Sequence, residues 1–363
     1  MKVALHTGQL LQPVPGGVGR YVRALLRHLP AAGVHTTAFG AGARPDNLTD
    51  PVEWVDLGWP HGSLRYEAWH RLRRPEVKVA GDLVHAPSLA VPPRGRRPLV
   101  VTVHDIAFLR FPEDTTRRGE RFHRRGLELA RRDADVIVTP SAFTRNELLL
   151  EGFDAKQVCV ASFGVDPPSP RPEEHLDLIL DALDLHAPFV LTVGTIEPRK
   201  NLSALVDAMQ MVRRTHPDVV LAVVGPSGWG DVRGLDRAGV RRLGQLPWAA
   251  VDALYRRARA CALVSHYEGF GLPALEALAR GAVLVCSDGS GVGEVVGDAA
   301  LRVDPRDTPA IASAISRALE DDDLRADMSA RGRDRAREFT WDRCAAAHAR
   351  IYDAARDVDA RRS

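Results

Sequence analysis

The most specific pattern in this chain is the segment Ser265-His266-Tyr267-Glu268-Gly269-Phe270-Gly271-Leu272-Pro273-Ala274-Leu275-Glu276-Ala277. It follows the short apolar run Cys261–Val264, which predicts a buried strand. Pro273 then stands in the first turn of a predicted helix, where proline is favoured. Backbone N–H groups between Gly269 and Leu272 can therefore point at a phosphate group at the start of that helix. A strand, a glycine loop and a helix in this order are typical of a parallel α/β sheet.

Two glutamates frame this glycine loop. Glu268 lies in the loop and Glu276 lies about one turn inside the predicted helix, so both carboxylates can face one ligand. Such a pair suits the hydroxyl groups of a sugar, because each hydroxyl needs an acceptor held in a fixed direction. Either glutamate alone would be read as a solvated surface residue, and only the whole string favours a sugar site.

A second loop follows the predicted strand Phe189–Val193 and reads Gly194-Thr195-Ile196-Glu197-Pro198-Arg199-Lys200-Asn201. We expect Asn201 to cap the helix that begins after it. Arg199 and Lys200 then lie beside a helix N-terminus, where a forked guanidinium and a compact ammonium suit a diphosphate. The alternative is an exposed basic pair near a turn. Of the four lysines in the chain, only Lys200 falls in such a motif.

A third glycine-rich segment, Gly16-Gly17-Val18-Gly19, opens the first predicted helix. Glycines there let a ligand approach the backbone and the helix N-terminus. The spacing does not match the dinucleotide fingerprint, and the second predicted strand ends without the acidic residue that such a site needs. A phosphate contact and a tight structural turn both remain open.

Short apolar runs alternate along the chain with segments of helical periodicity. These runs are Lys2–His6, Val34–Phe39, Leu83–His85, Leu99–Val103 and Asp135–Thr139 in the first half, and Phe189–Val193, Val219–Val224, Cys261–Val264, Val283–Cys286 and Leu301–Val303 in the second. The alternation predicts an α/β protein whose parallel sheets are covered by helices on both faces.

The length of 363 residues favours two domains. The boundary is predicted within Asp166–Pro188, which opens with a proline-rich run suited to a linker. We therefore predict two doubly wound domains, 1–175 and 176–340, that face each other across a cleft. Ligands are expected near the carboxyl ends of the strands.

Composition argues against several other classes of protein. The 49 basic residues are balanced by 47 acidic ones, which argues against a partner held by bulk charge, such as nucleic acid. The four cysteines form no CxxC or Cys/His pattern, which argues against a disulfide framework or a zinc site. The apolar run at the N-terminus is too short for a signal peptide, and no stretch approaches a membrane span. We expect a cytoplasmic protein.

Taken together, the motifs resemble those of the retaining glycosyltransferases of family four, also called glycosyltransferases group 1. The matching segments, in order, are Gly16–Gly19, Thr102–Asp105, Gly194–Asn201 and Glu268–Glu276. The resemblance implies the GT-B fold, in which two Rossmann-like domains face each other. Residues 1–175 would bind the acceptor and residues 176–340 the nucleotide-sugar, and a C-terminal helix at about 341–363 would pack back onto the first domain.

The resemblance also implies a role for each matching residue. Arg199 and Lys200 would bind the diphosphate and stabilise the departing charge, while Glu268 would hold a hydroxyl of the transferred sugar and His104 would sit near that sugar. The other donor-binding positions are Gly16, Gly17 and Gly19 (closing over the phosphates), Gly194, Leu246 (beside the nucleobase), Phe270, Gly271 and Leu272 (backbone donors) and Glu276 (ribose hydroxyls). Attack would take place on the front face without a covalent intermediate, with Asp105 as an unproven helper. Neither a metal nor a cofactor is expected, because no D-x-D pair lies at a matching position.

Within the family, the segment Thr102–Phe108 followed by Phe111-Pro112-Glu113 resembles mannosyltransferases. GDP-mannose is therefore the first donor expected, while UDP-glucose, UDP-N-acetylglucosamine and dTDP-sugars stay open. The acceptor would be a glycan or a lipid-linked saccharide of cell-envelope polysaccharide or glycoconjugate synthesis. Two alternatives are a nucleotide-sugar epimerase on the same fold and a non-catalytic nucleotide-sugar-binding module.

The segment Arg117–Arg132 holds seven arginines and two glutamates. Relatives that use lipid-linked acceptors suggest peripheral contact with an anionic membrane through this segment. A solvated helical face explains the same charge run, because such runs are common.

Overall fold

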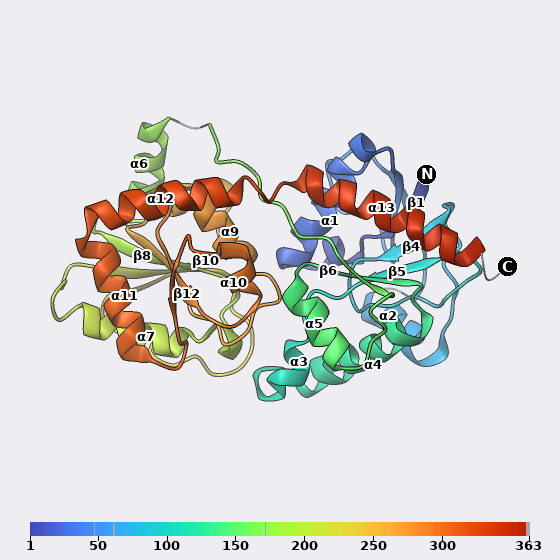
Figure 1. Cartoon of the computed structure of the whole chain (residues 1–363), viewed down its shortest axis with the longest axis horizontal. Coiled ribbons are helices and arrows are strands. Elements are labelled where there is room, and N and C mark those ends of the chain that lie inside the picture. Colours follow the sequence, from blue (N-terminus) through green and yellow to red (C-terminus); the bar gives the residue numbers. More distant parts are fainter. Residues whose placement is uncertain (47, 61, 171, 361–363) are drawn as a thin grey trace. The chain divides into compact units, whose positions relative to one another are not determined.

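The computed structural model describes residues 1–46, 48–60, 62–170 and 172–360. The chain forms two compact units (Figure 1). The first unit comprises Met1–Arg110, Arg117–Gly164 and the chain from Thr340 onward, and the second comprises Phe111–Thr116 and Val165–Phe339. The main division thus falls after Gly164, before the sequence-based boundary at residue 175.

The first unit contains a seven-stranded sheet in the order β3-β2-β1-β4-β5-β6-β7, with every pair of neighbours parallel. The strands are β1 (Lys2–His6), β2 (His35–Gly40), β3 (Glu53–Asp56), β4 (Leu83–Ala86), β5 (Leu99–Thr102), β6 (Val136–Thr139) and β7 (Val158–Val160). The central strands are buried apolar runs, as parallel strands covered on both faces must be.

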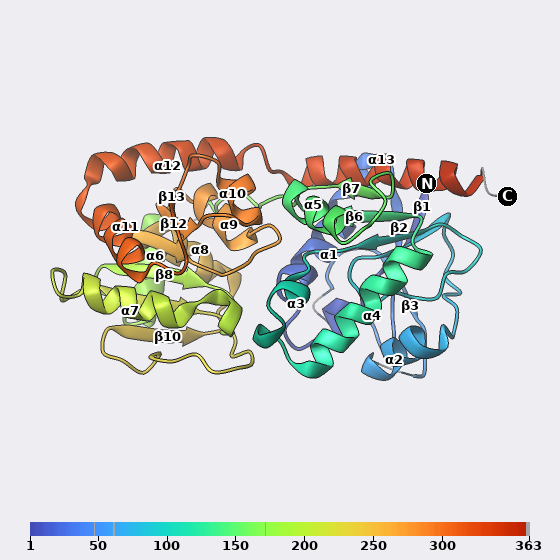
Figure 2. The same ribbon diagram turned by 60° about the horizontal axis from the view of Figure 1, so that its bottom comes forward.

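Helices cover both faces of this sheet. They are α1 (Gly16–His28), α2 (Gly62–Leu72), α3 (Ala107–Arg110), α4 (Arg117–Asp133), α5 (Ala142–Leu150) and α13 (Trp341–Ala360). In Figure 2 the strands of this unit lie between α13 above and α2 and α4 below. The C-terminal helix α13 belongs to this unit and packs against α1. Residues 361–363 of the expected C-terminal helix lie outside the described residues.

The second unit contains a six-stranded parallel sheet in the order β10-β9-β8-β11-β12-β13. Its strands are β8 (Phe189–Val193), β9 (Val220–Val224), β10 (Val240–Gly244), β11 (Ala260–Leu263), β12 (Leu284–Ser287) and β13 (Leu301–Val303). Its helices are α6 (Glu173–Ala182), α7 (Leu202–Val212), α8 (Trp248–Arg257), α9 (Leu272–Ala279), α10 (Gly291–Val296), α11 (Thr308–Glu320) and α12 (Asp322–Ala336). The predicted linker Asp166–Pro188 therefore contains a helix, α6.

Both sheets place their first strand in the middle and reverse the strand order there. The reversal falls between β1 and β4 in the first unit and between β8 and β11 in the second. In open sheets of this kind, ligands bind outside the carboxyl ends of the strands at the point of reversal. The prediction of two doubly wound α/β sheets is confirmed.

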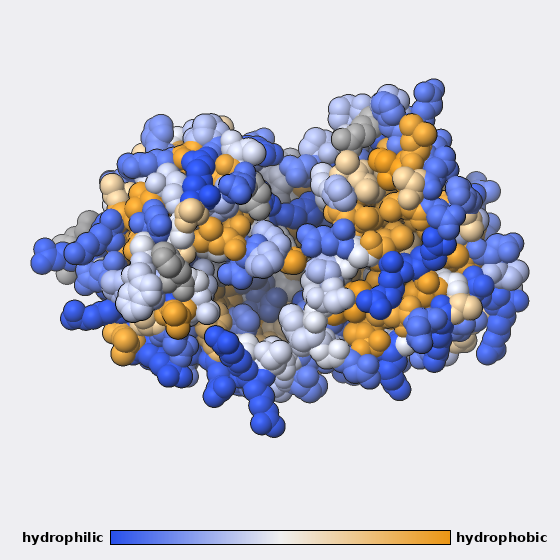
Figure 3. Space-filling model, turned by 180° about the vertical axis from the view of Figure 1, so that it is seen from behind, coloured by the Kyte–Doolittle hydropathy of each residue, from blue (hydrophilic) through white to orange (hydrophobic). Residues whose placement is uncertain are grey.

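None of the helices in the described part of the chain is long and apolar enough to cross a membrane. On the face drawn in Figure 3, hydrophilic side chains surround smaller hydrophobic areas.

Candidate functional site

The two loops singled out in the second half of the sequence meet at the strand reversal of the second unit. β8 and β11 are neighbours, with Val190 paired to Ala260. The loop Gly194–Asn201 follows β8 and the loop Ser265–Gly271 follows β11. Because both strands are parallel, both loops leave the same edge of the sheet. The structure therefore brings their charged side chains together.

Glu268 is the centre of this charged cluster. Lys200 Nζ lies 2.6 Å from Glu268 Oε1, and Arg199 Nη1 lies 3.3 Å from Glu268 Oε2. The Ser265 hydroxyl donates to Glu268 Oε1 at 2.7 Å. Arg199 Nη2 also pairs with Glu197 Oε1 at 2.6 Å. Two cations are thus held by two buried carboxylates beyond the carboxyl ends of the central strands β8 and β11.

These contacts set the charge state of Glu268. Burial by itself raises the pKa of this carboxyl, but the charges of Lys200 and Arg199, with hydrogen bonds from Lys200 and Ser265, outweigh it and lower the pKa to about 2. Glu268 is therefore ionised at neutral pH, and its carboxylate can only accept hydrogen bonds.

The depressed pKa of Glu268 predicts a pH-dependent contribution to stability. A glutamate titrates near 4.3 when unfolded, so the stabilisation is fully present above that pH and is lost as the pH falls through about 2. The pH-dependent part is expected to be roughly 2–3 kcal/mol. Urea unfolding of the native chain and of Glu268→Gln should differ by more at pH 6 than at pH 2.5. An equal difference at the two pH values would contradict the ion pairing.

Helix α9 begins where the glycine loop ends. Gly271 has a φ of 92°, and a Cβ there would come within 2.5 Å of Val292 Cγ2, so the close turn requires glycine. The Gly291 N–H donates to the Glu268 carbonyl at 2.9 Å, which fixes the loop from its other side. These contacts hold the backbone of Phe270, Gly271 and Leu272 at the start of α9.

Glu276 lies inside α9 and is buried. The Tyr255 hydroxyl, from α8, donates to Glu276 Oε2 at 3.1 Å. The tyrosine thereby orients the carboxylate for which the family resemblance implies a contact with ribose hydroxyls.

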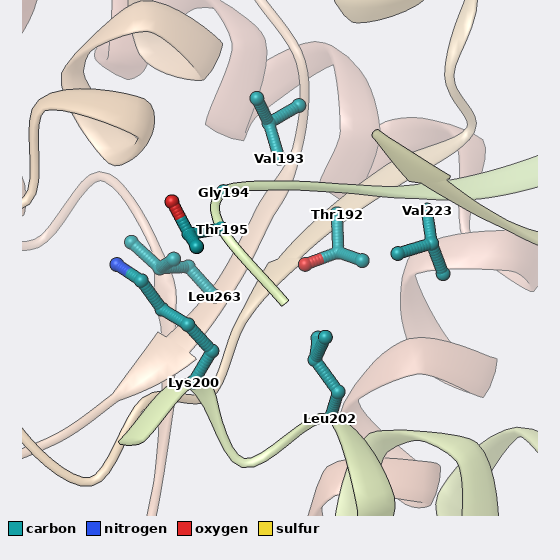
Figure 4. A pocket seen from close by; sticks show the side chains of 8 residues that line it. All are labelled: Thr192, Val193, Gly194, Thr195, Lys200, Leu202, Val223 and Leu263. Carbon is teal, nitrogen blue, oxygen red and sulfur yellow. The ribbon is translucent and has the colours of Figure 1, made fainter. Parts of the chain in front are cut away.

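A small pocket lies against the loop after β8 (Figure 4). Its lining residues are Thr192, Val193, Gly194, Thr195, Lys200, Leu202, Val223 and Leu263. A Cβ on Gly194 would lie 3.4 Å from Lys200 Cε, so the glycine leaves room for the lysine chain to run beside the strand end. In Figure 4 the Lys200 ammonium reaches toward Thr195 and Leu263 at one end of this pocket.

Asn201 does not act as expected. It precedes α7 with a φ of 55°, and its side chain leaves the helix end uncapped. Its Nδ2 instead donates to the carbonyl oxygens of Val264, at 3.0 Å, and Pro305, at 2.7 Å. The residue therefore braces the cationic loop against the end of β11, which the expectation of a helix cap did not foresee.

In the first unit, the glycine-rich segment has two different environments. A Cβ on Gly16 or Gly17 would meet no neighbouring atom within 4 Å, so the start of α1 is open there. A Cβ on Gly19 would collide with Pro15, which makes that glycine a packing requirement. Access for a ligand is thus confined to the first two glycines.

His104 follows β5 in the first unit and has a defined tautomer. Its Nε2 lies 2.7 Å from the Pro87 carbonyl, which can only accept, so Nε2 carries the hydrogen. Burial lowers the pKa of His104, and the Pro87 and Asp105 oxygens oppose this without cancelling it. The ring is therefore neutral at pH 7, with a lone pair on Nδ1. Asp105 Oδ1 accepts from the Ala107 N–H at 3.0 Å and so has a structural role at the start of α3.

Comparison with known proteins agrees with this geometry. The model described as Glycosyl transferases group 1 matches residues 181–335, and the model described as Glycosyltransferase Family 4 matches residues 15–169. The O-antigen chain mannosyltransferase B of Escherichia coli is 34% identical over 273 residues, covering 72% of this chain and 71% of that protein. The chain belongs to the group 1, family-four glycosyltransferases.

Alignments with more distant relatives extend over nearly the whole of this chain. A glycogen synthase of Mycobacterium tuberculosis is 29% identical, covering 98% of this chain and 95% of its own length. The solved structure of Anabaena HepE in complex with UDP and glucose superposes with a TM-score of 0.76 at 21% identity, covering 98% of this chain and all of that one. This likeness shows the GT-B fold, as the sequence predicted.

The glycosyltransferase has three site residues that the sequence analysis did not single out. Glu197, Tyr255 and Ser265 each bind a residue of the candidate site, at the distances given above. Glu197 and Ser265 lie within the two loop segments quoted above, whereas Tyr255 lies in α8, and only the folded chain shows which neighbour each one contacts. The predicted nucleobase residue Leu246 is half-buried and lies in the short connection between β10 and α8.

The basic helix α4 of the glycosyltransferase has partners for much of its charge. Arg124 pairs with Glu120 at 2.7 Å, Arg125 with Glu128 at 3.0 Å and Arg132 with Asp133 at 2.6 Å, while Arg131 lies over the Phe153 ring. Arg117, Arg118 and Arg121 are exposed at the start of the helix. Membrane contact through this helix stays a prediction.

Proposed function

We propose that this glycosyltransferase is a retaining hexosyltransferase that moves mannose from GDP-mannose to a hydroxyl acceptor. The observation that carries the proposal is the cluster of Arg199 and Lys200 around the buried Glu268 at the strand reversal. Relatives named as mannosyltransferases, from O-antigen chain and serotype-specific synthesis in Escherichia coli, support the sugar. A glycan or lipid-linked saccharide of the cell envelope is the proposed acceptor.

The cationic pair supplies the charge stabilisation that departure of a nucleoside diphosphate needs. Lys200 and Arg199 are held by the carboxylates of Glu268 and Glu197. A bound diphosphate would share these cations, and their fixed positions avoid reorganisation as the leaving charge grows. Glu268 would then accept from a hydroxyl of the transferred sugar.

The transfer itself is proposed to follow front-face attack. A bond forms between the acceptor oxygen and the anomeric carbon while the bond to the leaving phosphate oxygen breaks on the same face, and the acceptor proton passes to that phosphate oxygen. His104 would accept from a sugar hydroxyl through Nδ1, because Nε2 is committed to Pro87. The other donor-binding roles given above are proposed unchanged, with Glu276 and the open glycines Gly16 and Gly17 holding the nucleotide part.

The reaction is proposed to need no metal. Arg199 and Lys200 already provide two positive charges for a diphosphate, which is the task that a divalent cation performs in other enzymes. Transfer should therefore continue in EDTA. Loss of transfer in EDTA with rescue by magnesium would contradict this.

A panel of nucleotide-sugars tests the donor. GDP-mannose at about 100 times its Kd is expected to stabilise the protein by about 2.7 kcal/mol, a rise in Tm of roughly 3–4 °C for a chain of this length. UDP-glucose, UDP-N-acetylglucosamine and dTDP-glucose should give smaller shifts, and the Arg199→Ala variant should respond to none. A larger shift with UDP-glucose would contradict the donor but not the site, whereas equal shifts in the native chain and Arg199→Ala would contradict the site.

The same donors separate the two alternative functions. An epimerase would convert the sugar when incubated with donor alone, and sugar analysis of that mixture would show a second hexose. A binding module would show the thermal shift without release of nucleoside diphosphate in the presence of acceptor. The proposed transferase should release it with the donor's anomeric configuration retained in the product.

A further inference from the structure

The C-terminal helix α13 is joined to β4 and β5 of the first unit by a chain of buried hydrogen bonds between side chains. The Tyr21 hydroxyl lies 2.6 Å from His348 Nε2 and 3.0 Å from Thr102 Oγ1. Thr102 Oγ1 lies 2.8 Å from His85 Nε2, and His85 Nδ1 lies 2.8 Å from the Tyr352 hydroxyl. All five side chains belong to residues at most 1% exposed. Both ends of the chain lie on α13.

The protons of this chain have one consistent arrangement. His348 Nδ1 lies 2.8 Å from the Cys344 carbonyl, which can only accept, and burial lowers the pKa of His348 to about 4. The neutral ring must therefore accept at Nε2 from the Tyr21 phenol. Thr102 then donates to the Tyr21 oxygen and accepts from His85 Nε2. Each hydrogen bond thus has a single direction, and the phenol of Tyr21 is fixed from two sides.

The ring of Tyr21 also packs against the imidazole of His104. The two ring centroids lie 5.4 Å apart at an interplanar angle of 84°, an edge-to-face contact. Phe163 lies 4.9 Å from Tyr21 and 5.6 Å from His104, and Trp341, the first residue of α13, lies 6.1 Å from Phe163. Together with the hydrogen bond to Pro87, these rings leave the imidazole one orientation.

We propose that the C-terminal helix positions His104 for sugar transfer, with His348 holding the Tyr21 phenol and the Tyr21 ring holding the imidazole. Tyr21 and His348 are positioning residues, since they act through His104. The inference rests on the proposed contact of His104 Nδ1 with the transferred sugar. A misplacement of about 1 Å in such a contact can lower the rate up to 100-fold. Packing that fixes the His104 ring would therefore maintain the rate of transfer.

The orientation of His104 can be measured directly by NMR of the full chain labelled with 15N-histidine. The His104 signal is identified by its loss in His104→Gln, and the native chain should show the Nε2–H tautomer. Tyr21→Phe and His348→Gln should each shift this signal toward a mixture of tautomers. Tyr66→Phe is the control, because it removes a phenol hydroxyl from α2 in the same unit, outside this hydrogen-bond chain, and it should leave the signal unchanged. An unchanged His104 signal in both Tyr21→Phe and His348→Gln would overturn the proposal.

Kinetics then test whether the positioning serves the reaction. With GDP-mannose as donor, Tyr21→Phe should lower the kcat for release of GDP by about tenfold and leave KM within about twofold. In the His104→Ala background, the same substitution should cause no further fall, because coupled residues do not add. A fall of equal size in both backgrounds would overturn the proposal. If His104→Ala leaves release unchanged, the role of His104 in transfer is wrong, and the NMR result still decides whether α13 holds its ring.

Discussion

Replacement of Lys200 by alanine is expected to lower the kcat of sugar transfer by about 100- to 1,000-fold. The Lys200 ammonium lies 2.6 Å from Glu268 at the carboxyl edge of the sheet, where the proposed diphosphate leaves. Removing one fixed donor from a site of developing negative charge typically costs this much. Because the charge grows mainly in the transition state, kcat should fall more than KM rises.

Two further variants make this expectation specific. Lys156 is exposed in the first unit, so Lys156→Ala removes an equal charge away from the cluster and should keep kcat within about twofold. Lys200→Arg keeps the charge but replaces a compact ammonium by a planar fork, and it should restore only part of the rate. A kcat for Lys200→Ala within a factor of three of the native value would show that Lys200 does not bind the leaving group. Initial rates of nucleoside diphosphate release measure all three variants.

The candidate site was predictable because each of its charged residues lies in a short loop after a central strand. Arg199 and Lys200 follow β8 by a few residues, as Glu268 follows β11, so each position depends only on finding the end of a strand. Those strands were predictable because parallel central strands are buried on both faces and read as continuous apolar runs. The meeting of the two loops then follows from the strand order of a doubly wound sheet.

The strands that the sequence analysis missed all lie at sheet edges. β3, β7 and β10 each pair with a single neighbour in the described sheets. β10 includes Arg241 and Arg242, and β3 begins and ends with acidic residues, because an edge strand is partly exposed and needs no apolar run. Periodicity and apolar content therefore carry little signal for edge strands, although they find the centre of the sheet.

Contacts between distant segments were also outside the reach of the sequence. Nothing near Tyr21 indicates that its hydroxyl meets His348, which is more than 300 residues away. Likewise Asn201 has the side chain of a helix cap, and the competing carbonyls of Val264 and Pro305 are visible only after folding. The helix-cap propensity of asparagine did not decide the position of this side chain. The buried amide of Asn201 is bound more strongly by the two carbonyls than it would be at a solvated helix end.

Replacement of Arg280 by alanine is expected to have the largest effect on stability, a loss of about 3–5 kcal/mol in the free energy of unfolding. Arg280 Nε donates to Asp252 Oδ1 at 2.9 Å, and both side chains are buried. Its other nitrogens donate to the carbonyls of Asp166 and Pro167, and its guanidinium lies over the Trp248 ring. The substitution therefore leaves a buried carboxylate without its cation and frees the segment that enters the second unit.

Two causes of that loss, the unpaired carboxylate of Asp252 and the freed segment at Asp166 and Pro167, can be separated by further variants. Arg337 pairs with Asp334 at the surface, so Arg337→Ala removes an ion pair of the same kind and should cost at most about 1 kcal/mol. The double variant Arg280→Met/Asp252→Leu removes both buried charges, and it should recover most of the stability that Arg280→Ala loses. If the double variant is as unstable as Arg280→Ala, the unpaired carboxylate is not the cause, and the bonds from Arg280 to Asp166 and Pro167 must hold the segment instead. Urea unfolding of the four proteins decides between the two, because an unpaired buried charge and a freed segment predict opposite results for the double variant.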